Sequence, residues 1–122
     1  MMTHLQLAGP LSLNVYNPGL EAIFQVSSTL ILGKNEAVLI DAQFAGNDAR
    51  ALAELIHKSG RSLSAIYISH GDPDFYFGLD VPRDAFPQAR IQASQATIDH
   101  IRNSWDNKLK VWGPKLGPNA PE

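Results

Sequence analysis

Short runs that mix apolar and polar positions fill the first third of the chain. They are LSLNVYN at 11–17, AIFQVSSTLIL at 22–32 and AVLIDA at 37–42, all rich in β-branched and aromatic residues. Between the last two runs, Gly33 and Asn35 of GKNE suit a tight hairpin connection. This part of the sequence therefore predicts an antiparallel meander of strands. We expect His4, which precedes it, to lie in a frayed end.

The apolar residues then change to a helical period. Residues 47–60 are bounded by Asn47 or Asp48 as a predicted N-cap and by Gly60 as a C-terminal stop. The residues that share one face of this helix are Ala51, Leu52, Leu55 and Ile56. The apolar run 62–69 follows as a buried strand, so the order is strand, helix, strand. Such a unit normally joins parallel strands through a right-handed crossover.

The last third of the chain predicts one more strand and a long helix. Residues 90–94 (RIQAS) are the strand, after a stretch in which Pro82 and Pro87 bracket at most a short helix. Ser94 is the predicted N-cap of a helix over 95–112, in which apolar residues recur at Ile98, Ile101, Trp105 and Leu109. The tail from 113 is rich in proline and glycine and predicts irregular structure. The whole pattern indicates an α/β protein with a mixed sheet.

Composition narrows the classes of function. A chain of 122 residues with 44% hydrophobic residues fits a single domain over residues 1–122. A net charge of −2 provides no basic field for nucleic acid. The absence of cysteine excludes thiolate nucleophiles and sulfur-ligated metals, so a metal would need nitrogen and oxygen ligands. Without an apolar run of about 18 residues or a charged leader, we expect a soluble, cytoplasmic protein with no membrane partner.

The segment HGDPDF, residues 70–75, carries the candidate chemistry. His70 follows the predicted strand 62–69, at the end where α/β sheets present functional residues. In an extended or gently turning backbone, His70, Asp72 and Asp74 would point the same way and offer three ligands to a divalent cation. The cation would also remove the repulsion between the two carboxylates. The same segment also fits a solvated turn in which Asp72 or Asp74 caps a short helix, because Asp and Gly are common turn residues.

Other residues near this segment favour structural roles. Phe75, Tyr76 and Phe77 either wall a pocket for an apolar group or, as we favour, pack the loop onto the sheet. Ser69 does not predict a catalytic triad with His70, because neighbouring strand residues point to opposite faces. We assign no function to the remaining histidines, His4, His57 and His100, or to the tryptophans.

Motif and element order together resemble the metallo-β-lactamase superfamily. Its members carry HxHxDH at a strand end, after an upstream strand that ends in Asp and a helix. Here VLIDA supplies Asp41, the helix and the strand IYISH follow, and HGDPDFYFG ends in Gly78. The resemblance covers residues 12–112 and implies half of an αββα sandwich, with helices on one face of the sheet. By the same resemblance, Asp41 orients a ligand or the loop.

The sequence departs from the family motif at two positions. His70 and Asp74 match the first His and the Asp, whereas Asp72 and Phe75 replace the other two His. The resemblance then implies one metal rather than two, held by His70 and Asp72, with zinc favoured and manganese or iron as alternatives. Asp74 would orient the metal-bound water or accept its proton.

Two classes of function follow from these residues. The first is a metal-dependent hydrolase of a small-molecule substrate, attacking an ester, amide or related bond. The alternative is a catalytically inactive, metal-free relative that serves as a binding or assembly module. Since the sequence matches only the N-terminal half of the fold, we expect either a missing C-terminal half or a homodimer to cover the sheet.

Overall fold

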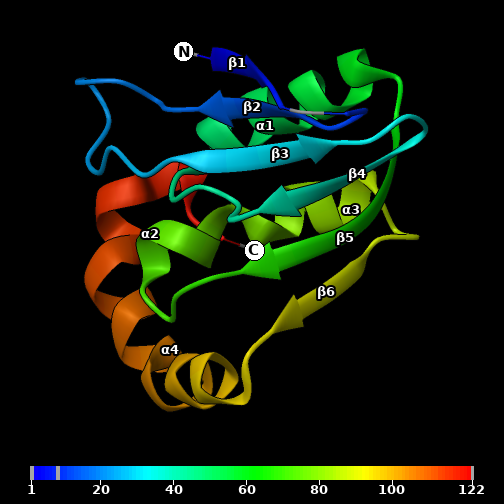
Figure 1. The fold of residues 1–122 in the computed structure, drawn as a ribbon. Coiled ribbons are helices and arrows are strands. Elements are labelled where there is room, and N and C mark those ends of the chain that lie inside the picture. The colour runs from blue at the N-terminus through cyan, green and yellow to red at the C-terminus, as the bar shows by residue number, and fades with distance from the viewer. Residues whose placement is uncertain (1, 8, 122) are drawn as a thin grey trace.

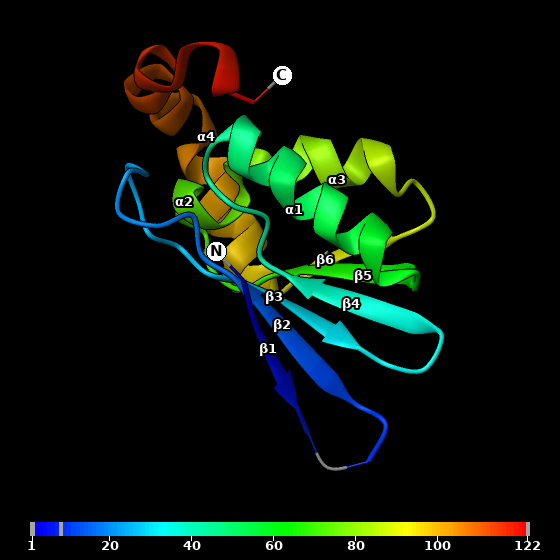
Figure 2. The same cartoon turned by 90° about the horizontal axis from the view of Figure 1, so that it is seen from above.

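The computed structural model describes residues 2–7 and 9–121, which form a sheet of six strands with helices packed on one side (Figures 1 and 2). The strands are β1 (Met2–Gln6), β2 (Ser12–Tyr16), β3 (Ser28–Leu32), β4 (Glu36–Ile40), β5 (Ser62–Ile68) and β6 (Arg90–Ala93). The helices are α1 (Gly46–Ser59), α2 (Pro73–Tyr76), α3 (Asp80–Ala85) and α4 (Gln95–Leu116). Short 3₁₀ turns occupy Phe77–Leu79 and Gly117–Asn119.

The sheet is mixed, as the sequence predicts. Strands β1 to β4 form an antiparallel meander, and β4, β5 and β6 run parallel. The predicted hairpin joins β3 and β4, where the backbone N–H of Gly33 donates to the carbonyl of Glu36 at 2.8 Å. The parallel arrangement places the carboxyl ends of β4, β5 and β6 at one edge of the sheet, where the candidate motif begins.

The N-terminal segment corrects the prediction of a frayed end. Residues Met2–Gln6 pair with β2 as an edge strand, and His4 lies opposite Asn14, whose side-chain oxygen it contacts. The predicted strand 22–32 is shorter than expected, because residues 22–27 are irregular before β3 begins.

Helix α1 begins at Gly46, with Ala45 rather than Asn47 or Asp48 at the N-cap. Both predicted caps have partners elsewhere: the N–H of Asn47 donates to Oδ1 of Asn119, and Asp48 accepts from the hydroxyl of Tyr16. Gly60 ends the helix in a left-handed conformation, as predicted.

The buried and exposed faces of α1 differ in part from the predicted helical face. Leu52 and Ile56 are buried, while Ala51 is exposed. The face that packs against the sheet also includes Ala49 and Ala53.

Helix α4 extends past its predicted end. Ser94 caps it as expected, accepting from the N–H of Thr97 at 3.2 Å, but the helix continues through Pro114 to Leu116. Pro114 has no N–H to donate to the carbonyl four residues earlier, and burial of Leu116 holds the last turn against the core despite this loss. No helix in the described part of the chain is long and apolar enough to cross a membrane.

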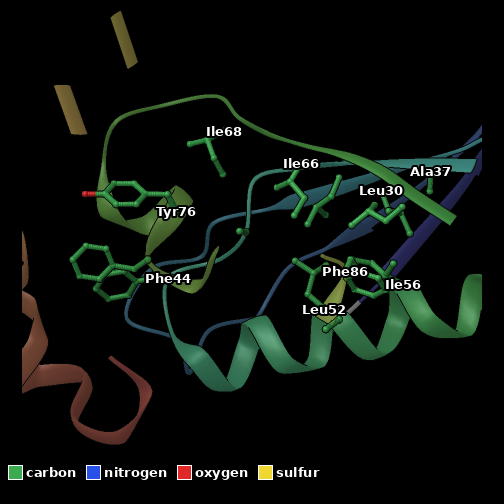
Figure 3. Close-up of a cluster of buried hydrophobic side chains, with 14 of the residues drawn as sticks. Leu30, Ala37, Phe44, Leu52, Ile56, Ile66, Ile68, Tyr76 and Phe86 are labelled. Carbon is green, nitrogen blue, oxygen red and sulfur yellow. The ribbon is translucent and has the colours of Figure 1, made fainter. Parts of the chain in front are cut away.

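The hydrophobic core fills the space between the sheet and its helices. Figure 3 shows Leu30, Ala37 and Ile66 of the strands facing Leu52 and Ile56 of α1, with Phe86 beside them. Phe44 and Tyr76 extend this cluster toward α4. Trp105 and Trp112 pack against it. Tyr76 and Phe77 of the motif belong to this core and so have the packing role that the sequence favours, whereas Phe75 lies outside the cluster.

The opposite face of the sheet is not covered by a described helix, as Figure 2 shows. Alternation along the paired strands turns one set of residues toward this side. The central members of the set are Leu13, Val15, Thr29, Ile31, Val38, Ile40, Ala65 and Tyr67. None of them is charged, so we call this set the apolar sheet face.

Candidate functional site

Asp41 follows β4 directly and organises the neighbouring strand end. Its backbone N–H continues the ladder to the carbonyl of Tyr67 at 2.9 Å. The side chain is buried, and Oδ1 accepts from the N–H of Ser69 at 2.8 Å. Asp41 adopts φ of 67°, a left-handed conformation that Asp tolerates better than most residues. The carboxylate is thus fixed beneath the turn that carries His70.

Ser69 connects Asp41 to His70. The Ser69 hydroxyl donates to Oδ2 of Asp41 at 2.5 Å, and its oxygen lies 2.7 Å from Nδ1 of His70. Because the carboxylate only accepts, the single hydroxyl proton is committed to Asp41, and the oxygen accepts from Nδ1–H of His70. In a neutral imidazole, this chain of hydrogen bonds places the proton on Nδ1 and leaves the lone pair on Nε2 of His70.

The contact between Ser69 and His70 corrects one sequence argument. Alternation along a strand predicts opposite directions for the two side chains, but β5 ends at Ile68, so both residues lie in the turn. The order of the chain, with the hydroxyl between carboxylate and imidazole, also differs from a nucleophilic triad. His70 donates to Ser69 and so cannot take its proton.

The His70 ring is exposed and stacks on Phe75. Their centroids lie 4.3 Å apart, with an interplanar angle of 25°. Phe75 stands where the resembled motif has its last His, so an apolar ring covers one side of the imidazole. Together with Ser69, this contact limits the orientations of His70.

The two aspartates of the motif, Asp72 and Asp74, differ in backbone conformation. Asp72 is extended and precedes α2, whereas Asp74 lies in the first turn of that helix. The backbone N–H of Phe75 donates to the carbonyl of Asp72 at 3.1 Å, which closes the turn. The segment is therefore extended only as far as Asp72, because a helix begins at Pro73. The assignment of His70, Asp72 and Asp74 as ligands of one cation stays a prediction.

Asp74 is nevertheless electrostatically linked to the other candidate residues. Partial burial raises the pKa of its carboxyl, and the negative charges of Asp72 and Asp41 raise it further. A hydrogen bond from backbone and the nearby His70 act in the opposite direction. Asp74 therefore holds a proton more readily than an exposed aspartate.

Helix α2 is fastened to the loop after β4. The N–H of Ala42 donates to the carbonyl of Phe75 at 2.9 Å, and the N–H of Gly78 donates to that of Gln43 at 2.9 Å. A Cβ on Gly78 would lie 2.5 Å from the carbonyl oxygen of Ala42, so this approach requires glycine. Close packing therefore explains why the motif has glycine at position 78.

Gln43 is a structural residue that the sequence reading did not single out. It is fully buried with φ of 73°, and its side-chain amide donates to the carbonyl of Val26 and to Oγ of Ser28, both at 2.9 Å. These bonds hold the strained loop after β4. A polar residue two positions after a strand-end Asp carries no sequence signal that would have revealed this role.

The other histidines lie apart from the described motif or touch only its backbone. His57 is in the last turn of α1, and its ring packs against Phe86 at an interplanar angle of 40°. His100, on α4, abuts the backbone of the motif: a Cβ on Gly71 would lie 2.8 Å from its ring. Gly71 therefore lets α4 approach the turn closely.

The candidate metal ligands meet the needs of a metal site only in part. Nε2 of His70 is oriented as a nitrogen ligand, but no three His, Asp or Glu side chains within residues 2–7 and 9–121 are placed to hold a metal ion. Asp41 has its carboxylate committed to Ser69. The described residues alone therefore do not complete a metal site.

Comparison with known proteins identifies relatives by sequence and by fold. The family described as the metallo-beta-lactamase superfamily matches residues 22–109. The uncharacterized protein YobT of Bacillus subtilis (strain 168) is 30% identical over 74 residues, covering 61% of this chain and 31% of YobT.

Solved structures confirm the fold. The metallo-beta-lactamase FIM-1 from Pseudomonas aeruginosa, in its mono-zinc form, matches with a TM-score of 0.61 at 11% identity, over 85% of this chain and 46% of FIM-1. A metallo-beta-lactamase from Hirschia baltica matches with a TM-score of 0.61 at 10% identity, over 85% of this chain and 48% of that protein. The chain thus spans about half the length of these enzymes.

Proposed function

Because the chain belongs to the metallo-beta-lactamase superfamily, we propose that it supplies half of a metal-dependent hydrolytic site. The single observation that supports this most strongly is the hydrogen-bonded chain from Asp41 through Ser69 to His70. It fixes the imidazole with Nε2 free, which is the form in which histidine binds a divalent ion. The proposed substrate is a small molecule with an ester, amide or related bond.

The proposed ligands from this chain are His70 and Asp72. Zinc suits the nitrogen ligand, and the carboxylate also admits manganese or iron. When bound, such an ion acts as a Lewis acid and lowers the pKa of its water to about 7. The mono-zinc form of FIM-1 is a precedent for a single ion in this fold.

Asp74 is the proposed proton acceptor. Its partial burial and its acidic neighbours raise the pKa of its carboxyl, which brings it closer to the range in which a carboxylate exchanges protons with a substrate. The Asp74 carboxylate would accept a proton at one oxygen, while the turn at Pro73 keeps this carboxylate near His70. A variant Asp74→Ala should lose hydrolytic activity, and full activity in that variant would remove this role.

The remaining ligands are proposed to come from outside the described residues. Two sources fit: a C-terminal half in a longer protein, or a second copy in a homodimer. The apolar sheet face supports this part of the proposal, because it lies on the side without helices and continues to the strand ends that carry Asp41 and His70.

A metal-free binding or assembly module is the second candidate function. Two observations favour it: no three ligand-type side chains converge in the described part of the chain, and Phe75 covers one side of His70. In that case the motif serves to shape a turn, and Asp41 and Ser69 stabilise it.

Metal content per chain separates the two proposals. Protein purified without chelator and incubated with zinc, manganese or iron is measured by elemental analysis, beside His70→Ala and Asp72→Ala. The control is His57→Ala, which removes an exposed histidine of α1. Near-stoichiometric metal that is lost in both motif variants and kept in the control supports the hydrolase. Metal-free wild-type protein supports either the module or a fragment whose metal site is completed by a missing C-terminal half.

A further inference from the structure

We propose that a cavity between β6, α4 and the 3₁₀ turn after α2 binds a small amphipathic carboxylate. The cavity has a volume of about 230 Å³ and opens to solvent. Its apolar lining comes from both layers of the fold and consists of Ile68, Leu79, Ile91, Ala93, Ile98 and Ile101. This site lies on the helix side of the sheet and does not rest on the metal proposal.

The apolar lining is unusually accessible for a small domain. Ile91 on β6 keeps 45% of its surface exposed, although its side chain is on the face that carries the helices. Helix α4 covers the edge strand β6 incompletely, and the cavity lies in the space that is left between them. An alkyl or aryl group that fills it would bury apolar surface from several strands and turns at once.

Arg102 supplies the polar end of the cavity. It lines the cavity from α4 and is exposed. Asp99 and Asp106 lie three and four residues away on the same helix, yet neither forms an ion pair with it; the ion pair found among residues 2–7 and 9–121 is Arg83 with Asp84. The guanidinium is therefore free to bind an anion, and its planar donors match a carboxylate.

Tyr76 adds an unpaired polar group next to the apolar wall. Tyr76 lines the cavity, and its hydroxyl is buried without a hydrogen-bond partner among the described residues. A buried hydroxyl without a partner lowers the stability of the fold. Arg102 is the charged residue among those that line the cavity, so the ligand has its apolar part against the isoleucines and its charge at Arg102.

Calorimetric titration of the full chain with octanoate tests the proposal. Octanol and octylammonium, which have the same alkyl chain, report the contribution of the charge. We expect octanoate to bind with a dissociation constant below about 1 mM, and the other two compounds to bind at least several-fold more weakly. Equal binding of all three, or no binding of octanoate, would overturn the proposal.

Two variants and a control locate the ligand. Arg102→Gln should weaken octanoate binding about tenfold, because it removes a charged hydrogen-bond donor. Ile98→Phe should abolish binding by filling the cavity. Lys110→Gln removes an exposed cation from the same helix, so octanoate affinity should be unchanged. Unaltered affinity in Arg102→Gln or in a folded Ile98→Phe would also reject the site.

Discussion

The hydroxyl oxygen of Ser69 lies 2.5 Å from Oδ2 of Asp41, although 28 residues separate the two in the chain. Parallel pairing of β4 and β5 brings their carboxyl ends together, and the left-handed backbone of Asp41 turns its carboxylate under Ser69. Because Ser69 also accepts from His70, a buried acid controls the orientation of an exposed imidazole. The relationship is open to direct measurement.

Ser69→Ala should release His70 from its fixed tautomer. The variant removes the acceptor of Nδ1–H, so neutral His70 should populate both tautomers, which long-range ¹H–¹⁵N NMR of the ring distinguishes. The free energy of unfolding should fall by about 1–2 kcal/mol, since Asp41 loses a donor.

Ser69→Thr is the matched control for this variant. It keeps the hydroxyl, so the Nδ1–H tautomer should persist. An unchanged tautomer in Ser69→Ala would show that the serine does not orient the ring.

Gly78→Ala should destabilise the fold through one added methyl group. That group would lie 2.7 Å from Cβ of Ala49 as well as close to the carbonyl of Ala42. Overpacking of this kind costs about 1–3 kcal/mol or more, seen as a lower urea midpoint.

Gly113→Ala provides the comparison. A Cβ there meets Cδ1 of Leu109 at 3.8 Å, an ordinary contact. Because the residue before Pro114 is disfavoured in helical geometry once it has a Cβ, the urea midpoint should fall slightly, but less than in Gly78→Ala. Equal midpoints for the two variants would contradict the close approach at Gly78.

Tyr16→Phe should change how stability depends on pH. Burial and the hydrogen bond to Asp48 raise the pKa of Tyr16 from 10.0 to about 12. Below pH 10 both states hold the proton and the stabilisation is complete. Between pH 10 and 12 the unfolded state loses its proton first, so stability falls as the pH rises.

Urea unfolding across this range measures the effect. Tyr16→Phe should lose about 1 kcal/mol at pH 7 and show a shallower fall in alkali. Part of the fall should remain, because burial and Asp72 raise the pKa of Tyr76 to about 12 as well. Parallel curves for wild type and variant would argue against the contact with Asp48.

The apolar sheet face should cause the isolated chain to associate. Ile31→Lys places a charge at its centre and should shift sedimentation toward a monomer, since a buried ammonium is costly. Leu20→Lys, at a loop position with 88% exposure, should leave association unchanged. A monodisperse, folded wild-type monomer would refute this prediction.

Much of the fold could be predicted because local rules and burial agree. The hairpin at Gly33, the parallel pair around α1, the stop at Gly60 and the cap at Ser94 are confirmed. The hairpin, the stop and the cap each depend on residues within a few positions of one another, and the parallel pair follows from the order strand, helix, strand. The family resemblance is confirmed by the match over 22–109.

Other features depend on partners distant in sequence. The side chain of Asn119 accepts the N–H of Asn47, and the hydroxyl of Tyr16 donates to Asp48. With these partners, neither residue is the N-cap of α1, and the helix begins earlier than predicted. Burial of Leu116 carries α4 through Pro114, and pairing with β2 orders His4 in a strand. No local propensity reports such contacts.

The pattern of residues along the chain was enough to predict the class of fold, the family and the place of the motif at the end of β5. What the motif residues do with one another depends on the tertiary structure. It begins a helix at Pro73, which separates Asp74 from the extended turn at Asp72, and it links Asp41, Ser69 and His70. The reason is physical: periodicity fixes which face a strand residue occupies, but a turn after the strand takes its shape from hydrogen bonds and packing with distant segments.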